Sequence, residues 1–236
     1  MTSAATPSEI PLTADAIAAG QAVYSPRLLA WYDLLVLSLS CRFAWRCPAR
    51  QMLAMYNENV SDNHLEGGVG TGYFLDRCRF PTPQPRLALV DLNPHCLATT
   101  SRRLARFHPA CYQRNLLEPL SLPVSHFDSA GINFVLHCLP RTLRDKGVIF
   151  DHLSQVVRPG GVIFGATILS VGVPVSFLAQ RLMRHYNRRR IFSNESDSLE
   201  GLQEVLQARF DDWHIRTSGS VALFRARVRS APVCRS

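Results

Sequence analysis

Three alternating glycines stand where a short run typical of a strand gives way to an apolar run typical of a helix. They are Gly68, Gly70 and Gly72, within residues 64–75. Because glycine lacks a Cβ, the backbone can turn tightly here and approach a ligand closely. The amide groups that begin the next helix would point into the same turn and favour a polar or anionic group. Glu66, two residues before Gly68, would face whatever the turn holds.

The spacing of these glycines differs from two common nucleotide-binding motifs. Dinucleotide dehydrogenases carry Gly-x-Gly-x-x-Gly after the first strand, whereas residues 68–72 read Gly-Val-Gly-Thr-Gly. The phosphate-cradling pattern Gly-x-x-x-x-Gly-Lys-Ser/Thr is absent as well, and no lysine is available to serve it. The turn therefore matches neither of these motifs.

Strand-like and helix-like segments alternate after the glycine turn, which indicates a doubly wound parallel sheet. The predicted strands, in chain order, span residues 63–66, 86–90, 110–114, 129–134 and 162–168. The predicted helices span residues 72–77, 94–107, 145–157, 173–186 and 198–210. Residues 213–217 and 221–228, joined by a turn at 218–219, predict an antiparallel hairpin that closes the chain.

The residues ahead of the glycine turn are predicted to form a helical cap. Apolar residues recur at helical spacing in residues 27–42, and Pro48 opens a further helical segment. Tyr24 and Tyr32 would enclose a ligand or an acceptor from this cap, although core packing is the simpler account. The apolar run would lie over a ligand site, or else on a membrane surface, and burial is the more usual outcome. We expect a disordered tail at 1–12, the helical cap at 13–60, a ligand-binding domain at 61–229 and a second tail at 230–236.

Composition indicates a globular protein with a single sizeable α/β domain. Of 236 residues, 47% are hydrophobic and 19% are charged. No stretch reaches the about 18 uncharged apolar residues that span a bilayer, and the start of the chain lacks a secretory signal. Seven scattered cysteines without Cys-x-x-Cys indicate reduced thiols in the cytoplasm. Histidines and carboxylates are not grouped at ligand spacing, so we expect no metal.

The formal net charge of +8 comes almost entirely from arginine, because Lys146 is the only lysine. A basic patch would attract nucleic acid or an anionic substrate. The favoured alternative is a biased genome composition, in which arginine replaces lysine on ordinary solvated surfaces. Aromatic residues are not interleaved with the arginines, as binding of single-stranded nucleic acid would favour. The basic cluster within residues 181–190 would receive an anionic or carrier-bound acceptor, or would lie on a solvated helix face.

Several of these signals, in this order, resemble the class I S-adenosylmethionine-dependent methyltransferase family. Residues 65–72 resemble its glycine motif, Val90 and Asp91 the acidic end of its second strand, and residues 158–161 the turn before its fifth strand. The resemblance covers residues 63–228. It implies a Rossmann-like α/β fold with a seven-stranded sheet, mostly parallel but with an antiparallel carboxy-terminal hairpin. The implied cofactor is S-adenosylmethionine, which leaves as S-adenosylhomocysteine.

The resemblance assigns cofactor binding to residues at the ends of the predicted strands. These residues are Glu66, Gly68, Gly70, Gly72, Asp91, Leu92, Asn115, Leu116 and Asn133. The Asp91 carboxylate would accept hydrogen bonds from the ribose hydroxyls; capping of the next helix is the structural alternative. Asn115 stands where the family often has an acidic residue that contacts the adenine amine. Its side-chain carbonyl can still accept from that amine.

Residues 133–140 lie where the family places side chains beside the transferred methyl group. Methyl transfer is an in-line displacement at a sulfonium carbon, so the enzyme chiefly positions the nucleophile and excludes water. Phe134 would contact the acceptor. His137 is the candidate general base, because its ordinary pKa is near neutrality. The alternative is a histidine of the scaffold whose ring is satisfied by the backbone.

Taken together, the sequence predicts a cytoplasmic methyltransferase that acts on a small organic acceptor. The more detailed prediction is that this acceptor belongs to specialised metabolism. Two other functions stay open. In the first, the protein binds S-adenosylmethionine but catalyses a different reaction or none. In the second, it methylates or binds nucleic acid. Methylation of base amines is disfavoured, because no Asn-Pro-Pro-Tyr or Asp-Pro-Pro-Tyr motif follows the fourth predicted strand. The methylated atom, whether oxygen, nitrogen, sulfur or carbon, and the oligomeric state are not predicted.

Overall fold

A computed structural model of the protein describes residues 41–123 and 126–230. The predicted tail at 1–12, most of the helical cap, Tyr24 and Tyr32 lie outside the described residues, as do residues 231–236. The described part of the cap includes helix α3 (Ala49–Asn59), which Pro48 precedes as predicted.

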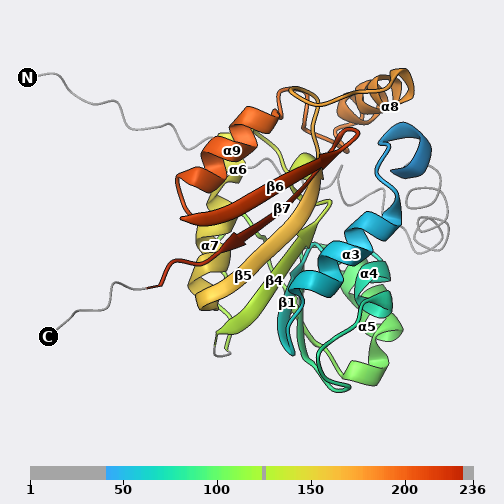
Figure 1. Ribbon diagram of the computed structural model, residues 1–236. Coiled ribbons are helices and arrows are strands. Elements are labelled where there is room, and N and C mark those ends of the chain that lie inside the picture. Colours follow the sequence, from blue (N-terminus) through green and yellow to red (C-terminus); the bar gives the residue numbers. More distant parts are fainter. Residues whose placement is uncertain (1–40, 124–125, 231–236) are drawn as a thin grey trace, which may run out of the picture.

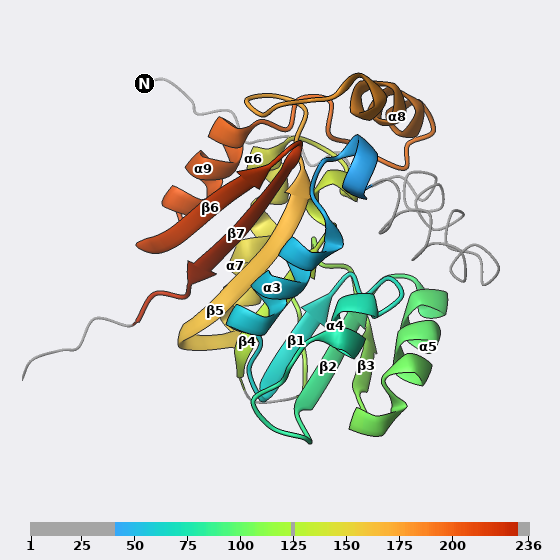
Figure 2. The ribbon, with the colours of Figure 1, turned by 45° about the vertical axis from the view of Figure 1, so that its right-hand side comes forward.

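The strands of the described residues form one seven-stranded sheet in the order β3-β2-β1-β4-β5-β7-β6 (Figures 1 and 2). The strands are β1 (Asn63–Gly67), β2 (Arg86–Asp91), β3 (Ala110–Gln113), β4 (Phe127–Asn133), β5 (Val157–Ile168), β6 (Asp212–Ser218) and β7 (Val221–Arg227). The first five are parallel, and β7 runs antiparallel to both β5 and β6. The predicted fold class and closing hairpin are thus confirmed. Strand order reverses between β1 and β4, the place where open α/β sheets bind ligands.

Helices cover both faces of this sheet and form a separate apolar core on each (Figure 2). One core is covered by α3, α4 (Tyr73–Arg77), α5 (Pro94–Arg103) and α8 (Phe177–Arg188). The other is covered by α6 (Leu143–Lys146), α7 (Val148–Val156) and α9 (Leu199–Gln207). Two short 3₁₀ helices, η2 (Ala105–Phe107) and η3 (Leu136–Cys138), follow α5 and β4.

Alternation along the strands decides which side chains enter which core. Phe164 of β5 belongs to the core under α3 and α4, whereas its neighbour Ile163 belongs to the other core. Successive side chains of a strand point to opposite faces of the sheet. In β1, His64 and Glu66 are two residues apart and share a face, and the His64 ring stacks against Phe164. Glu66 therefore lies on the face that α3 covers.

Several predicted helices begin or end differently in the structure. The helix predicted over residues 94–107 is α5 followed by the separate 3₁₀ helix η2, and the one predicted over 198–210 ends at Gln207. The single helix predicted over residues 145–157 is two helices, α6 and α7, joined at Gly147. The helix predicted over 173–186 starts at Phe177 instead. Ser176 caps it, because its Oγ accepts a hydrogen bond from the Ala179 amide over 3.1 Å. Pro174, three residues before Phe177, lacks the amide hydrogen that a continuing helix needs.

The turn predicted at residues 158–161 is part of β5 in the structure. The pairing of β4 with β5 shifts register there, because Phe127 pairs with Val157 and Ser129 with Val162. The extra residues form an irregularity in the strand, and Gly160 adopts a left-handed φ of +77° within it. The predicted turn therefore lies within the bounds of β5, at residues 158–161, which have no partner in the register between β4 and β5.

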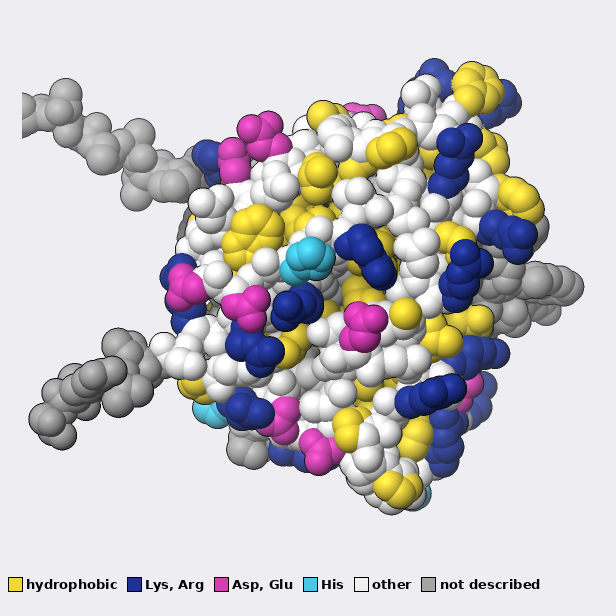
Figure 3. All heavy atoms as spheres, in the orientation of Figure 1, with side chains coloured by type: hydrophobic (Ala, Val, Ile, Leu, Met, Phe, Trp, Pro, Cys, Tyr) yellow, Lys and Arg dark blue, Asp and Glu magenta, His cyan; other side chains and the backbone are white. Residues whose placement is uncertain are grey.

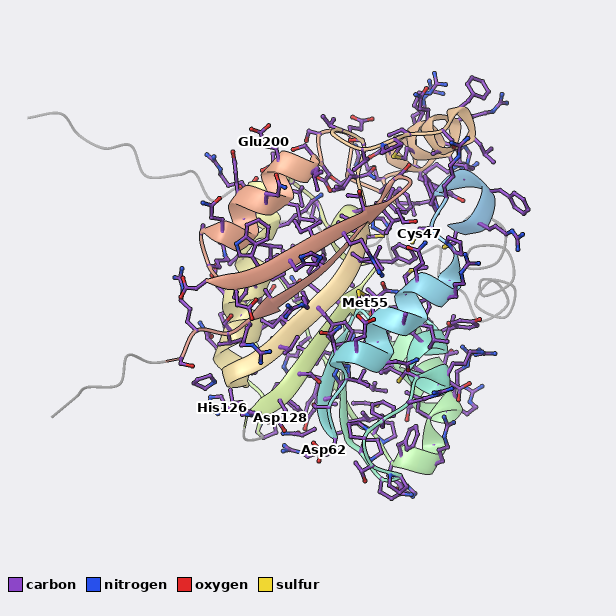
Figure 4. All side chains as sticks on the ribbon, viewed as in Figure 1. Cys47, Met55, Asp62, His126, Asp128 and Glu200 are labelled. Carbon is purple, nitrogen blue, oxygen red and sulfur yellow. The ribbon has the colours of Figure 1, made fainter. Side chains whose placement is uncertain are left out.

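The predicted ligand-binding residues lie at the carboxyl ends of the parallel strands and not at their amino ends. Asp62, His126 and Asp128 lie at the amino ends of β1 and β4, at the lower edge in Figure 4. The predicted ligand-binding residues lie at the opposite, carboxyl edge, where β1 ends at Gly67 and β2 at Asp91. Across the described part of the chain, no helix has the length and apolar character that crossing a membrane requires.

Candidate functional site

The glycine turn connects β1 to α4 as predicted. Gly68, Gly70 and Gly72 all have left-handed backbone, with φ of +67°, +52° and +72°. The Gly68 amide donates to the Val90 carbonyl over 2.8 Å, which ties the start of the turn to β2. Residues with a Cβ adopt this region at a cost, so the three glycines allow the chain to reverse within five residues.

The three glycines differ in what surrounds them. A Cβ at Gly68 would overlap the side chain of Val135, and a Cβ at Gly72 would lie 2.7 Å from Thr100 Cγ2. A Cβ at Gly70 would meet no atom of the described residues within 4 Å. Gly68 and Gly72 are therefore needed for packing inside the protein. Gly70 borders open space, where a ligand can approach the backbone.

Asp91 ends β2 directly beside this turn. Its Oδ1 accepts a hydrogen bond from the Asn93 amide over 2.8 Å, and the amides of Val69 and Gly70 also bond its carboxylate. Burial raises the pKa of Asp91 above its ordinary value, while these amides oppose the rise. Asn93, not Asp91, caps α5, because its side chain accepts from the His95 amide over 2.9 Å. Asp91 therefore stabilises the segment before α5 by a hydrogen bond and lies beside the glycine turn.

Asn115 lies after β3, two residues beyond the strand. Its Oδ1 accepts from the Leu117 amide over 3.0 Å, and its Nδ2 donates to Glu118 Oε1 over 2.9 Å. An amide oxygen has two lone pairs, so one remains for the adenine amine that the resemblance implies. The local turn fixes the side chain in place.

The loops that carry Leu92 and Leu116 also lie at this edge. The Leu92 carbonyl accepts from Gln113 Nε2 over 3.1 Å, which joins the ends of β2 and β3. The Leu116 side chain is buried and packs against β1, since a Cβ at Gly67 would come within 3.1 Å of its Cδ2. The two leucines therefore flank the glycine turn from one side.

Asn133 ends β4, the strand that follows the switch in strand order. Its Nδ2 lies 4.0 Å from Met52 Sδ on α3. Its Oδ1 is buried and has no hydrogen-bond partner within the described part of the chain. Leaving a buried acceptor unsatisfied costs about 1–3 kcal/mol. A cationic amino group, such as that of S-adenosylmethionine, would satisfy it, so the side chains present fit this cofactor.

Glu66 is buried under α3, with 4% of its surface exposed. Tyr56 of α3 donates its hydroxyl proton to Glu66 Oε1 over 2.5 Å, and His64 Nε2 lies 3.0 Å from Glu66 Oε2. Figure 4 shows α3 crossing in front of the strands, with Met55 labelled one residue before Tyr56. The sequence predicts Tyr56 only as one of the cap's aromatic residues that would enclose a ligand, and His64 is absent from the predicted site residues. Their contacts depend on how α3 docks and on strand pairing, which local sequence does not reveal.

Phe134 follows Asn133 and has a φ of +58°. Bulky residues rarely adopt this left-handed region, and such strain concentrates at ligand sites. The Phe134 amide donates to the Ala166 carbonyl over 2.7 Å, which holds the conformation against β5. The Phe134 ring meets the imidazole of His137 edge-on, with centroids 5.5 Å apart.

His137 lies on η3 and is buried. Its Nδ1 accepts a hydrogen bond from the Ile168 amide over 3.2 Å. Burial, and to a lesser degree the charge of Lys146, lowers the pKa of His137 to about 3. The neutral ring that accepts at Nδ1 carries its proton at Nε2 and has no free acceptor there. The geometry supports the alternative reading, in which the ring is satisfied by the backbone.

Cys138, the residue after His137, is also titratable. Burial raises the pKa of its thiol to about 12. Neither side chain therefore changes its charge near neutral pH. Within the described residues, no three His, Cys, Asp or Glu side chains gather in a way that would hold a metal ion.

The structure brings most predicted site residues to one edge of the sheet and leaves the basic cluster apart. Residues 181–190 lie on or just after α8, at the top of the molecule, and dark blue side chains gather along that side in Figure 3. Arg181, Arg184 and Arg188 are exposed. These arginines form an exposed helix face, and a role in receiving an anionic acceptor stays a prediction.

Comparisons with known proteins agree on one family. A family model described as a methyltransferase domain matches residues 65–163. The chain is 42% identical over 207 residues to demethylluteothin O-methyltransferase of Streptomyces thioluteus, covering 88% of this chain and 90% of the relative. It is 36% identical over 209 residues to the physcion biosynthesis cluster O-methyltransferase of Aspergillus chevalieri, covering 88% and 94%.

Solved structures show the same fold at much lower identity. The complex of DhpI with S-adenosylhomocysteine matches 91% of this chain and 98% of its own, with a TM-score of 0.61 and 16% identity. The N-methyltransferase NodS of Bradyrhizobium japonicum, also solved with S-adenosylhomocysteine, matches 77% and 86%, with a TM-score of 0.55. The glycine turn, the acidic end of β2, the sheet order and these relatives together establish that the chain belongs to the class I S-adenosylmethionine-dependent methyltransferases.

Proposed function

We propose that this methyltransferase transfers a methyl group to an acidic hydroxyl group of a small organic acceptor in specialised metabolism. Relatives at 42% and 36% identity are named O-methyltransferases, one of them from the physcion biosynthesis cluster. The observation that carries the proposal is the geometry of His137, whose Nδ1 accepts from the Ile168 amide over 3.2 Å, so the neutral ring has no free acceptor for a proton of the substrate. The pKa of His137 lies at about 3 and that of Cys138 at about 12, so neither accepts a proton near neutrality.

The cofactor, when bound, supplies an electrophilic methyl carbon on its sulfonium. Asp91 would accept hydrogen bonds from the ribose hydroxyls, and its charge strengthens such bonds. Asn133 would accept from the amino group through the oxygen that lacks a partner in the described residues. Asn115 and Leu116 would bound the adenine. Gly70 would allow the ligand to approach the backbone, because no atom from residues 41–123 or 126–230 fills the space beside it.

The acceptor must then lose its proton without help from these two side chains. A phenol, with a pKa of about 10, or a more acidic enol loses a proton far more readily than an aliphatic alcohol. Phe134, strained at the end of β4, would hold the acceptor against the reacting carbon and exclude water. Positioning of this kind supplies a large part of the barrier reduction in reactions between two bound molecules.

The experiment uses purified enzyme, S-adenosylmethionine and a series of phenols with graded acidity. We expect kcat/KM to rise with pH up to the pKa of each phenol, so that the midpoint moves with the acceptor. His137→Gln should keep that dependence. A midpoint that stays fixed while the acceptor changes would show a base on the enzyme and overturn the proposal.

Nitrogen is the competing acceptor atom. The N-methyltransferase vrtF of Penicillium aethiopicum is 34% identical over 184 residues, covering 77% of this chain and 76% of the relative. Aromatic amines of the same size should therefore be tested beside the phenols. Transfer to the amines alone would replace O-methylation by N-methylation.

Location and domain limits complete the proposal. The cysteines of the described residues are all free thiols, which supports a cytoplasmic site of action. Residues 61–229 would form the catalytic domain, with the helical cap before it. The described part of that cap already contacts the site, since Met52 and Tyr56 of α3 touch Asn133 and Glu66.

A further inference from the structure

A chain of buried polar side chains runs from α3 across β1 to β4. Tyr56 donates to Glu66 Oε1 over 2.5 Å, and Glu66 Oε2 lies 3.0 Å from His64 Nε2. His64 Nδ1 lies 2.8 Å from Ser129 Oγ. No more than 4% of any of these four residues is exposed. Water is therefore excluded from replacing a lost partner, and each missing hydrogen bond would leave a buried polar atom unsatisfied.

Ser61 sets the direction of the hydrogen bonds in this chain. Its Oγ donates to the Asn63 carbonyl over 2.9 Å, which uses its only hydroxyl proton. The Ser129 hydroxyl, 2.7 Å from Ser61 Oγ, must therefore donate to Ser61. With that proton committed, the Nδ1–H of His64 donates to Ser129. The remaining contact in the chain joins His64 Nε2 to Glu66 Oε2 over 3.0 Å.

Tyr56 acts as a donor to Glu66 throughout the physiological range. Burial, and to a lesser degree the charge of Glu66, raises the pKa of Tyr56 well above its ordinary value, so the hydroxyl keeps its proton. The Tyr56 ring stacks on Phe74 at 5.3 Å and meets Phe164 edge-on at 5.1 Å. These contacts would hold the ring in place even without the hydroxyl.

The absence of a side chain at Gly131 leaves space for the Glu66 carboxylate. A Cβ at Gly131 of β4 would overlap Glu66 Oε2. The same strand carries Asn133, whose Nδ2 lies 4.0 Å from Met52 Sδ. Helix α3 thus contacts two polar side chains at the carboxyl edge, Glu66 through Tyr56 and Asn133 through Met52.

We propose that Tyr56 and His64 are positioning residues that fix the Glu66 carboxylate for cofactor binding and so couple helix α3 to the cofactor site. The inference rests on the proposed role of Glu66 in holding the cofactor. Two donors, one from the cap and one from β1, orient the carboxylate before the cofactor arrives. Preorganisation of this kind raises affinity by removing the cost of ordering the side chain on binding.

The first test measures the dissociation constant of S-adenosylhomocysteine by calorimetry, with the melting temperature of each variant recorded beside it. Tyr56→Phe removes one hydroxyl and should weaken binding about tenfold, as expected for a lost hydrogen bond to a charged group. Tyr186→Phe is the matched control, because Tyr186 packs on the same core and its hydroxyl has no hydrogen bond within the described residues. Its affinity should equal that of the wild type.

A double-mutant cycle then asks whether Tyr56 acts through Glu66. In a Glu66→Ala background, Tyr56→Phe should change the affinity by less than twofold, because the group that Tyr56 positions is gone. Losses that simply multiply would show that Tyr56 acts independently and would overturn the proposal. His64→Phe should also weaken binding, and His64→Gln, which keeps a donor, should recover part of the loss.

The outcomes separate this inference from the proposed cofactor site. Unchanged affinity in Glu66→Ala would refute the cofactor role of Glu66 itself. Weakened binding in Glu66→Ala together with unchanged binding in Tyr56→Phe would refute only the positioning role. A lower melting temperature in Tyr56→Phe with wild-type affinity would assign Tyr56 to stability alone.

Discussion

Thr100 Oγ1 donates a hydrogen bond to the Gly70 carbonyl, 3.0 Å away. Thr100 is fully buried on α5, the helix that follows Asp91, and its Cγ2 lies 2.7 Å from where a Cβ at Gly72 would be. One threonine therefore holds two parts of the glycine turn, by a hydrogen bond at Gly70 and by close packing at Gly72. The glycines of this turn consequently have different tasks.

The first prediction compares Gly70→Ala with Gly72→Ala. Both add strain, since left-handed backbone costs a residue with a Cβ about 1–3 kcal/mol. The methyl group of Gly70→Ala meets no atom in the described part of the chain, so this variant should lose little more stability. The same methyl group enters the proposed ligand space and should weaken S-adenosylhomocysteine binding more than tenfold. Gly72→Ala should lose more stability because of Thr100. Urea unfolding and calorimetric titration measure the two effects.

Thr100 provides the control for this comparison. Adding Thr100→Ala to Gly72→Ala removes the overlapping methyl group and should restore part of the lost stability. The same addition to Gly70→Ala should restore none. Equal stability losses for the two glycine variants would contradict the division of tasks.

The second prediction concerns Asp91→Asn. Loss of the charge should weaken S-adenosylhomocysteine binding about tenfold or more, because hydrogen bonds to charged groups are worth about 1.5–3 kcal/mol. Burial raises the pKa of the Asp91 carboxyl, so acidification should protonate it and weaken wild-type binding at a higher pH than an ordinary aspartate would. Affinity should be highest above that raised pKa and fall below it. Titrations carried from neutral pH into the acidic range should show this fall in the wild type and a flatter response in Asp91→Asn.

The sequence was sufficient for the sheet and for the edge where the site lies. The alternation of strand and helix signals predicts a parallel sheet. Because parallel strands end at one edge of a sheet, the residues around Gly67, Asp91 and Asn133 are expected to lie close together there. The predicted limits failed where local signals competed. Gly147 splits one expected helix into two, and the residues around Gly160 lie within the bounds of β5 in spite of their turn-forming composition.

Partners distant in sequence were beyond prediction. Thr100 meets Gly70 across 30 positions, and His64 meets Ser129 across 65. Such pairs depend on strand register and helix docking, which a local pattern of residue types does not contain. The role of His137 was ambiguous for the same reason, since the amide that its ring accepts from belongs to Ile168 on another strand.

The third prediction is the pH dependence of stability that comes from His137. Its folded-state pKa of about 3 lies below the ordinary 6.5, so the unfolded chain binds a proton that the folded protein does not. Stability from this group is therefore present above pH 6.5 and is lost as the pH falls toward 3. From pH 7 to pH 5 the loss should be about 2 kcal/mol. His137→Gln removes the titrating ring, so the free energy of unfolding measured in urea should fall less steeply than in the wild type; parallel curves would contradict the assignment.

The last prediction concerns the ion pair of Lys146 and Asp197. Lys146 Nζ donates to both carboxylate oxygens of Asp197, over 3.0 and 2.8 Å, and to the Ser193 carbonyl over 2.5 Å, with both charged side chains fully buried. Lys146→Met leaves Asp197 as an unpaired buried charge and should cost about 3–5 kcal/mol in urea unfolding. Lys146→Met combined with Asp197→Leu removes both charges and should be more stable than the single variant, because no charge is left without a partner. The Ser193 amide also donates to the His137 carbonyl over 2.8 Å, so the single variant should disturb the loop behind His137 as well. A double variant as unstable as the single one would show that packing, and not the unpaired charge, sets the cost.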